Sequence, residues 1–285
     1  MKTGIKVLAC LGVGLLVAAT NAEWSSGFEP PTYIGSPAGV DLNGQDGFYN
    51  PSPADSVSFK VYSYAGNALG LPANPFGGEQ FVGGTGPGGS IFARSQRDMT
   101  YGDGTGLWTA AFDIAATYTG SGASNQNLGS FSTQPLDIYN PTAAAYICLT
   151  QWVDINNPTL WDANYVCFDA AGAYVYPAVV PDPAFHNLAI DHWYRWSTTF
   201  DFDSNMITEV SIMDLDTGTS ATYNPTGWYL GGGAGGGLAP PNGFRFFAGA
   251  ADPAGNTLAF DNLNIVPEPA GMLLLVLAGI GLRRR

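Results

Sequence analysis

Residues 193–223, WYRWSTTFDFDSNMITEVSIMDLDTGTSATY, decide the fold. Polar residues alternate with Phe200 and Phe202, Ser204-Asn205 turns the chain, and a second alternating run returns from that turn. Asp216-Thr217-Gly218 then provides the Asp and Gly that tight turns between antiparallel strands favour. This stretch therefore predicts two consecutive β-hairpins.

The same pattern of short β-branched and aromatic runs recurs through the middle of the chain. Turn-forming residues separate the runs, with 38 Gly and 20 Pro in 285 residues, and no long period of 3.6 competes with them. Expected strands are 57–64, 90–96, 107–115, 145–153, 164–169, 193–203, 206–214, 219–223, 243–249 and 257–265. Two glycine runs, 83–89 and 231–237, are expected to be surface loops. We predict an all-β, antiparallel two-sheet sandwich as a single domain over residues 23–265.

The charge of this middle region excludes one class of partner. The whole chain has a formal net charge of −13, and residues 23–265 hold 22 acidic side chains against five basic ones, a balance of −17. Such a surface repels phosphate backbones, so nucleic acid is not expected as a partner.

Both ends of the chain have the composition of processing signals. At the start, Lys2 and Lys6 precede an apolar run that leads to the small residue Ala22, the pattern of a secretory signal peptide over residues 1–22. At the end, residues 270–282 form an apolar stretch that is short for a transmembrane helix. The alternatives are a buried helix at the first end and an ordinary membrane anchor at the second.

The C-terminal residues resemble a known sorting signal. Pro267-Glu268-Pro269, the apolar stretch and Arg283-Arg284-Arg285 are similar to the PEP-CTERM signal of Gram-negative bacteria, a tail also called the ice-binding protein C-terminal domain. The resemblance covers residues 266–285. It implies that an exosortase recognises the tail before the protein is released or re-anchored at the cell surface or in the extracellular matrix.

Export places Cys148 and Cys167 in an oxidising compartment. If they face each other, the centre of the hairpin falls in the turn-like run Asn156-Asn157-Pro158-Thr159. The sequence therefore predicts a Cys148–Cys167 disulfide, the alternative being two free thiols in the core.

Fragments of the middle region resemble concanavalin-like and laminin-G-like jelly-roll domains. They are Gly27-Phe28-Glu29, Gly44-Gln45-Asp46-Gly47-Phe48, Trp193-Tyr194-Arg195-Trp196 and Phe260-Asp261-Asn262-Leu263, with Phe48 standing where Trp is expected. The resemblance implies adjacent first and last strands. It also implies a structural calcium ion bound by Glu29 and Asp261 with help from Asp46, unless these are exposed acids at strand edges; no cofactor is required.

Flat aromatic rings beside amide and carboxylate groups are typical of carbohydrate sites. The segment between the cysteines carries such a set, and core packing of its tryptophans is the alternative: Trp152, Asp154, Asn156, Asn157, Trp161 and Asp162. Glycoside hydrolysis needs paired carboxylates, and no Glu-x-Asp-x-x-Glu run is present.

We therefore expect an exported, non-catalytic protein associated with exopolysaccharide or biofilm matrix. Its acidic surface would engage an anionic polysaccharide through divalent cations. A lectin-like module and a polysaccharide-cleaving enzyme are the alternative functions.

Overall fold

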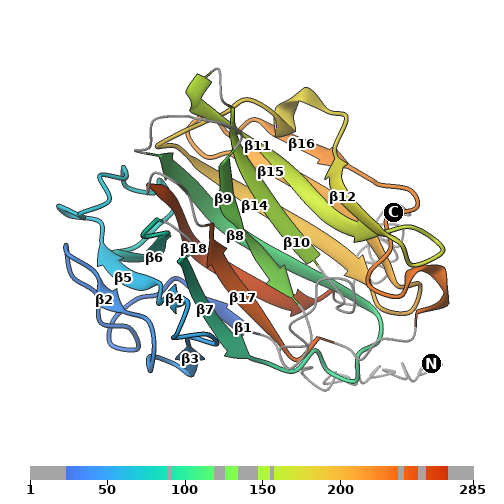
Figure 1. Cartoon of the computed structure of the whole chain (residues 1–285), viewed down its shortest axis with the longest axis horizontal. Coiled ribbons are helices and arrows are strands. Elements are labelled where there is room, and N and C mark those ends of the chain that lie inside the picture. The colour runs from blue at the N-terminus through green and yellow to red at the C-terminus, as the bar shows by residue number, and fades with distance from the viewer. Residues whose placement is uncertain are drawn as a thin grey trace, which may run out of the picture.

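The computed structural model describes residues 24–88, 91–118, 126–133, 147–154, 157–236, 241–249 and 255–268. Their strands form two antiparallel sheets, and in Figure 1 the short N-terminal strands gather at one end of the long ones. The two hairpins predicted between residues 193 and 223 are confirmed. The predicted signal helix over residues 1–22 and the apolar stretch 270–282 lie outside the described residues. Within the described part of the chain, no helix has the length and apolar character needed to cross a membrane.

Sheet 1 has the order β16 (Ser220–Tyr223), β15 (Met206–Asp214), β14 (Trp193–Asp201), β8 (Leu107–Tyr118), β18 (Asn256–Pro267), β6 (Gln80–Thr85), β5 (Lys60–Ser63) and β2 (Val40–Asp41). The first strand, β1 (Trp24–Ser26), pairs with the last, β18, so the expected adjacency of first and last strands is confirmed.

Sheet 2 has the order β12 (Tyr174–Val179), β11 (Asn157–Phe168), β10 (Ile147–Asp154), β9 (Gln126–Thr133), β17 (Gly243–Ala248), β7 (Phe92–Asp98) and β3 (Phe48–Tyr49). Two short strands join it: β13 (Leu188–Ala189) pairs with β11, and β4 (Ser56–Val57) runs parallel to β7. Short 3-10 turns, η2 (Pro183–Phe185) and η3 (Gly233–Gly235), lie in the connections.

The main core fills the space between the sheets with aromatic rings. Phe112 of β8 lies 4.7 Å from Phe131 of β9, and Phe246 of β17 stacks on Phe260 of β18 at 4.6 Å, measured between ring centroids. These contacts join sheet 1 to sheet 2 directly. Burial of large rings from both inner faces is the main stabilising contribution of a sandwich.

The prediction of a surface loop is wrong for Gly83 and Gly84, which lie buried in β6. A Cβ on Gly83 would lie 2.6 Å from Leu69 Cδ1, and one on Gly84 would lie 2.5 Å from Phe59 Cε2. These glycines are in the strand because neighbouring side chains occupy the space that any other residue would need.

The predicted disulfide is also wrong, although β10 and β11 do form the expected hairpin. The backbone register pairs Cys148 with Val166, one residue from Cys167, and Cys167 is a buried free thiol. A shift of one residue moves a side chain to the opposite face of a sheet, so this register does not suit a bridge.

Candidate functional site

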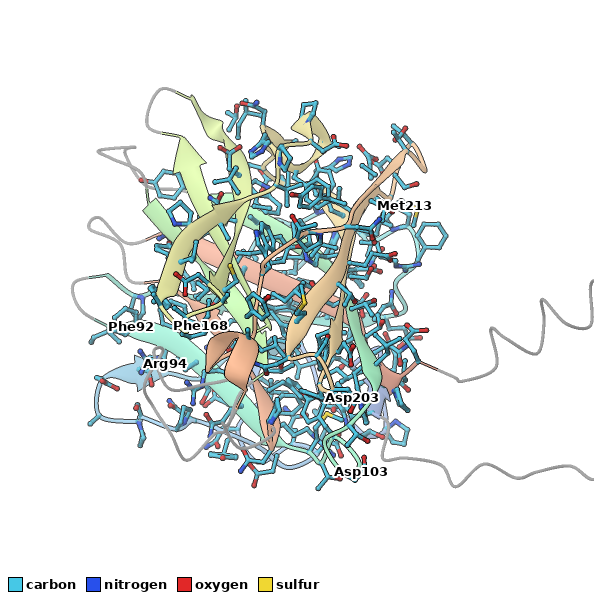
Figure 2. All side chains as sticks on the ribbon, turned by 90° about the vertical axis from the view of Figure 1, so that its right-hand side faces the viewer. Phe92, Arg94, Asp103, Phe168, Asp203 and Met213 are labelled. Atoms are coloured by element: carbon cyan, nitrogen blue, oxygen red, sulfur yellow. The ribbon has the colours of Figure 1, made fainter. Side chains whose placement is uncertain are left out.

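A cluster of arginine and aromatic side chains lies on the outer face of sheet 2. In β7, Ala93 and Ser95 are buried toward the core, so the alternating Phe92, Arg94 and Gln96 are on the other side. Figure 2 shows Phe92 and Arg94 on the sheet 2 side of the sandwich, opposite Met213 of sheet 1.

The neighbouring strand β17 completes this cluster. Phe247 is the register partner of Arg94, and Arg245 is the partner of Gln96. We call Phe92, Arg94, Gln96, Arg245 and Phe247 the arginine face.

Aromatic contacts fix Arg94 in place. Its guanidinium carbon lies 4.7 Å from the centre of the Phe92 ring and 5.2 Å from that of Phe247, and the two rings are 5.1 Å apart. Cation–π attraction of this kind contributes roughly 0.5–2 kcal/mol depending on solvent exposure. Arg94 is almost buried while the rings are half-buried, so cation and rings form one ordered platform.

A chain of hydrogen bonds fixes Arg245 and leads toward the end of β7. Arg245 Nε and Nη2 donate to Gln96 Oε1 at 2.9 and 2.5 Å, and Gln96 Nε2 donates to Tyr49 Oη at 2.5 Å. Tyr49 in turn donates to Asp98 Oδ1 at 2.8 Å. Burial, together with the bond to Asp98, raises the pKa of Tyr49, which keeps its hydroxyl protonated.

Asp98 lines a hollow of about 490 Å³ with Met99, Thr100 and Asn242. The hollow lies where β7 ends and β17 begins, so the hydrogen-bond chain runs from Arg245 to its wall.

The three acids expected to bind calcium accept hydrogen bonds from different partners. Glu29 accepts hydrogen bonds from the backbone N–H groups of Glu79 and Gln80. Asp46 accepts from Tyr33 Oη at 2.7 Å and lies 3.4 Å from Arg97 Nε.

Asp261, the third, lies with Asp113 and Tyr64 on the outer face of sheet 1. Across the described ranges, no group of three or more His, Cys, Asp or Glu side chains has the arrangement of a metal site.

The segment expected to bind a ligand is placed only in part. Trp161 is fully buried and donates from Nε1 to Ala189 O at 3.0 Å, so it packs in the core, the alternative considered for it. Asp162 accepts from the Asn187 N–H at 2.8 Å. Asn156 and the side chains of Trp152, Asp154 and Asn157 lie outside the described residues.

The sorting motif is described for its first two residues. Pro267 ends β18, and Glu268 donates its N–H to Leu107 O at 2.8 Å and accepts from Thr109 Oγ1 at 2.5 Å. Pro269 and Arg283, Arg284 and Arg285 lie outside the described residues.

Sequence reasoning missed the arginine face because its strands are far apart in the chain. The available signal was local: Arg94 and Arg245 are two of the five basic residues between residues 23 and 265, and each lies in a predicted strand. Only the pairing of β7 with β17 shows that they are neighbours.

Comparisons with known proteins find similarity of structure only. No family model matches the chain, and no curated protein sequence matches it. Arcelin-5, a lectin-like defense protein from Phaseolus vulgaris, is 10% identical, with a TM-score of 0.40 over 87% of this chain and 98% of that one. The alginate lyase Aly36B is 10% identical, with a TM-score of 0.44 over 88% and 100% of the two chains.

The endo-beta-1,4-glucuronan lyase of the fungus Trichoderma reesei is 12% identical, with a TM-score of 0.41 over 81% of this chain and 94% of that one. Similarity at this level concerns the arrangement of strands alone. The described residues form an all-β, antiparallel two-sheet sandwich similar to those of a lectin-like protein and of polysaccharide lyases.

Proposed function

We propose that this is an exported, non-catalytic protein that binds an anionic polysaccharide at the arginine face. The observation that carries the proposal is the pairing of Arg94 and Arg245, with Phe92 and Phe247, on adjacent strands of a strongly acidic chain. Two of the few basic residues are thereby placed side by side on the outer face of sheet 2, where each is 6% exposed.

The chemistry of the arginine face suits an acidic sugar. Guanidinium groups bind carboxylates with two parallel hydrogen bonds, whereas aromatic rings contact the C–H faces of a sugar ring. The side chains are ordered before binding, because Gln96 positions Arg245 and two rings position Arg94. Ordering in advance lowers the entropy cost of association.

The described side chains favour binding over cleavage. Asp98 is joined to the arginine face by hydrogen bonds through Tyr49 and Gln96, whereas glycoside hydrolysis needs two carboxyl groups about 5–9.5 Å apart. Burial raises the pKa of Tyr49, which keeps its hydroxyl protonated near neutral pH, so little phenolate is present to act as a general base. A polysaccharide-cleaving enzyme remains the alternative function, and release of new chain ends from an acidic polysaccharide would support it.

The two ends of the sequence supply the cellular part of the proposal. An N-terminal signal peptide would export the chain across the inner membrane of a Gram-negative bacterium, and an exosortase would process the Pro267-Glu268-Pro269 tail. Binding of exopolysaccharide would then retain the sandwich at the cell surface or in the biofilm matrix.

The binding experiment compares calorimetric titrations of the purified protein with a polyuronate and with neutral dextran. Arg94→Gln and Arg245→Gln should each weaken polyuronate binding roughly 10- to 100-fold, since a hydrogen-bonded charge contributes about 1.5–3 kcal/mol. Lys60→Gln is the matched control, because it removes the same charge from β5 of sheet 1 and should leave the affinity unchanged.

Two further conditions separate direct binding from cation bridging. Direct contact with arginine weakens as salt screens the charges but survives a chelator. Loss of binding in the chelator would instead favour divalent cations held by the acidic surface. Equal affinity for dextran, or unchanged affinity in both arginine variants, would refute the proposed site.

A further inference from the structure

The outward side chains of β7 change from positive to negative charge along the strand. Arg94, Gln96 and Asp98 are two residues apart, and the register with β17 is regular over this stretch, so the three share one face of sheet 2. Arg94 and Asp98 are four residues apart, or about 13 Å along the strand. A single sugar ring is much shorter than this, so a polysaccharide bound along β7 would place different sugar units at the two ends.

The positive end is the arginine face. Arg94 lies against the rings of Phe92 and Phe247, and Arg245 is the register partner of Gln96 on the neighbouring strand. An acidic sugar at this end meets two guanidinium groups, which bind carboxylates well.

The negative end opens into the hollow of about 490 Å³ that Asp98, Met99, Thr100 and Asn242 line. Asp98, Thr100 and Asn242 are exposed, whereas Met99 is almost buried. The register partner of Asp98 is Gly243, which has no side chain, so β17 leaves this part of the face open. A sugar unit can therefore reach the polar groups of the hollow.

The carboxylate of Asp98 gives the hollow its charge. Its Oδ1 accepts from Tyr49 Oη, a neutral donor, at 2.8 Å. The next residue back, Arg97, points to the opposite side of β7, where its Nε lies 3.4 Å from Asp46 Oδ2, and its Nη1 donates to the backbone oxygen of Asp98 at 3.1 Å. The nearest cation in the chain is thus paired with a different carboxylate.

This set of groups suits a neutral sugar. A carboxylate, a hydroxyl and an amide oxygen all accept hydrogen bonds from sugar hydroxyls, and the bonds to the charged carboxylate are the stronger ones. A second carboxylate in the same hollow would be repelled by Asp98. The hollow therefore disfavours the acidic unit that the arginine face favours.

Asp98 also helps to orient the arginine face. The Tyr49 hydroxyl donates to Asp98 and accepts from Gln96 Nε2 at 2.5 Å. The Gln96 amide is thereby turned so that its Oε1 accepts from Arg245. One hydrogen-bond chain thus fixes the two ends of the surface relative to each other.

We propose that the protein selects an acidic polysaccharide in which neutral sugars lie between the acidic ones. The arginine face takes an acidic unit, the hollow takes a neutral unit of the same chain, and Asp98 determines this specificity. The inference rests on the proposed binding at the arginine face, and it narrows the ligand from any polyanion to a chain of mixed charge.

The test compares two polymers with the same backbone in calorimetric titrations of the full chain. They are fully ionised polygalacturonate and polygalacturonate with half of its carboxyl groups methyl-esterified. The wild type should bind the half-esterified polymer roughly three- to tenfold more tightly, because an ester removes the charge from the unit that faces Asp98.

Asp98→Asn keeps an acceptor for Tyr49 but removes the charge. It should abolish the preference by raising the affinity for the fully ionised polymer roughly three- to tenfold. Glu209→Gln is the control, because it removes the same charge from β15 of sheet 1 and should keep the preference. It accounts for the overall repulsion between an acidic protein and a polyanion.

Thr100→Val provides a second variant if Asp98→Asn fails to fold. Thr100 is exposed, and the change removes a hydroxyl from the hollow. The variant should bind the half-esterified polymer roughly two- to tenfold more weakly and leave the affinity for the fully ionised polymer unchanged.

The arginine variants separate failure of this inference from failure of the proposed function. Suppose that Arg94→Gln weakens binding of both polymers. Equal wild-type affinities, a preference that persists in Asp98→Asn, or one that disappears in Glu209→Gln would then overturn the mixed-charge specificity alone. If Arg94→Gln and Arg245→Gln leave both affinities unchanged, the proposed function fails and this inference fails with it.

Discussion

Replacement of Arg195 by Leu should destabilise the sandwich through Asp113. The change removes both hydrogen bonds from the guanidinium and leaves Asp113 and Asp261 buried in sheet 1 without a bonded cation. Removal of one partner of a buried ion pair costs about 3–5 kcal/mol. The Arg195 side chain is 37% exposed, so the expected loss is at the lower end of that range, about 3 kcal/mol.

The assay is urea unfolding followed by tryptophan fluorescence. With a denaturant slope of about 1–3 kcal/mol per molar urea, a loss of about 3 kcal/mol lowers the midpoint by about 1–3 M. The loss should be larger at pH 8 than at pH 5. Burial raises the pKa of Asp261 to about 7, so at pH 5 this side chain is protonated and repels Asp113 less.

The double variant Asp113→Asn/Arg195→Leu is the control for the Asp113 carboxylate that Arg195→Leu leaves without a cation. It should be more stable than Arg195→Leu alone at pH 8, since the uncompensated carboxylate is then absent. A midpoint for Arg195→Leu within about 0.2 M of the wild type, or a double variant that loses the sum of both single changes, would refute the reasoning.

Two further predictions concern the interior. Gly84→Ala should lower the free energy of unfolding by about 1–3 kcal/mol, measured by urea unfolding, because its Cβ would lie 2.5 Å from Phe59 Cε2. Gly218→Ala is the control for backbone strain, because Gly218 has a φ of +71° but no atom within 4 Å of its added Cβ. Cys167 should resist alkylation by iodoacetamide at pH 8 until denaturant is added, because burial raises the pKa of its thiol to about 12. Peptide mapping by mass spectrometry would measure the alkylation. A Cys148–Cys167 cross-link in the same peptide map would contradict the register of β10 and β11.

The sequence by itself was sufficient to locate the hairpins and most of the long strands. In β14 and β15, the alternation of side chains and the turn at Asn205, whose φ is +55°, are properties of neighbouring residues. The turn at Asp216-Thr217-Gly218 is also formed by neighbouring residues, because Asp214 Oδ1 accepts hydrogen bonds from the N–H groups of Asp216 and Thr217. Local chemistry of this kind is readable without knowledge of the rest of the chain.

Predictions from local sequence patterns were wrong where contacts with residues distant in the chain decide the structure. The glycines of β6 were predicted to form a loop. They are in a strand because side chains from other segments fill the space beside them, as the Phe59 ring does beside Gly84. The hairpin of β10 and β11 was expected, but its register shifts between Val153 and Asp154, so the turn residues did not fix the pairing of Cys148.

The candidate sites depend entirely on tertiary structure. Gln96 and Arg245 are 149 residues apart in the chain, and Asp113 and Asp261 come from strands with most of the domain between them. Alternation along a strand decides which residues share a face, but only the order and register of strands decide which faces meet. That order is set by packing of the aromatic core between the sheets, which is a property of the whole chain.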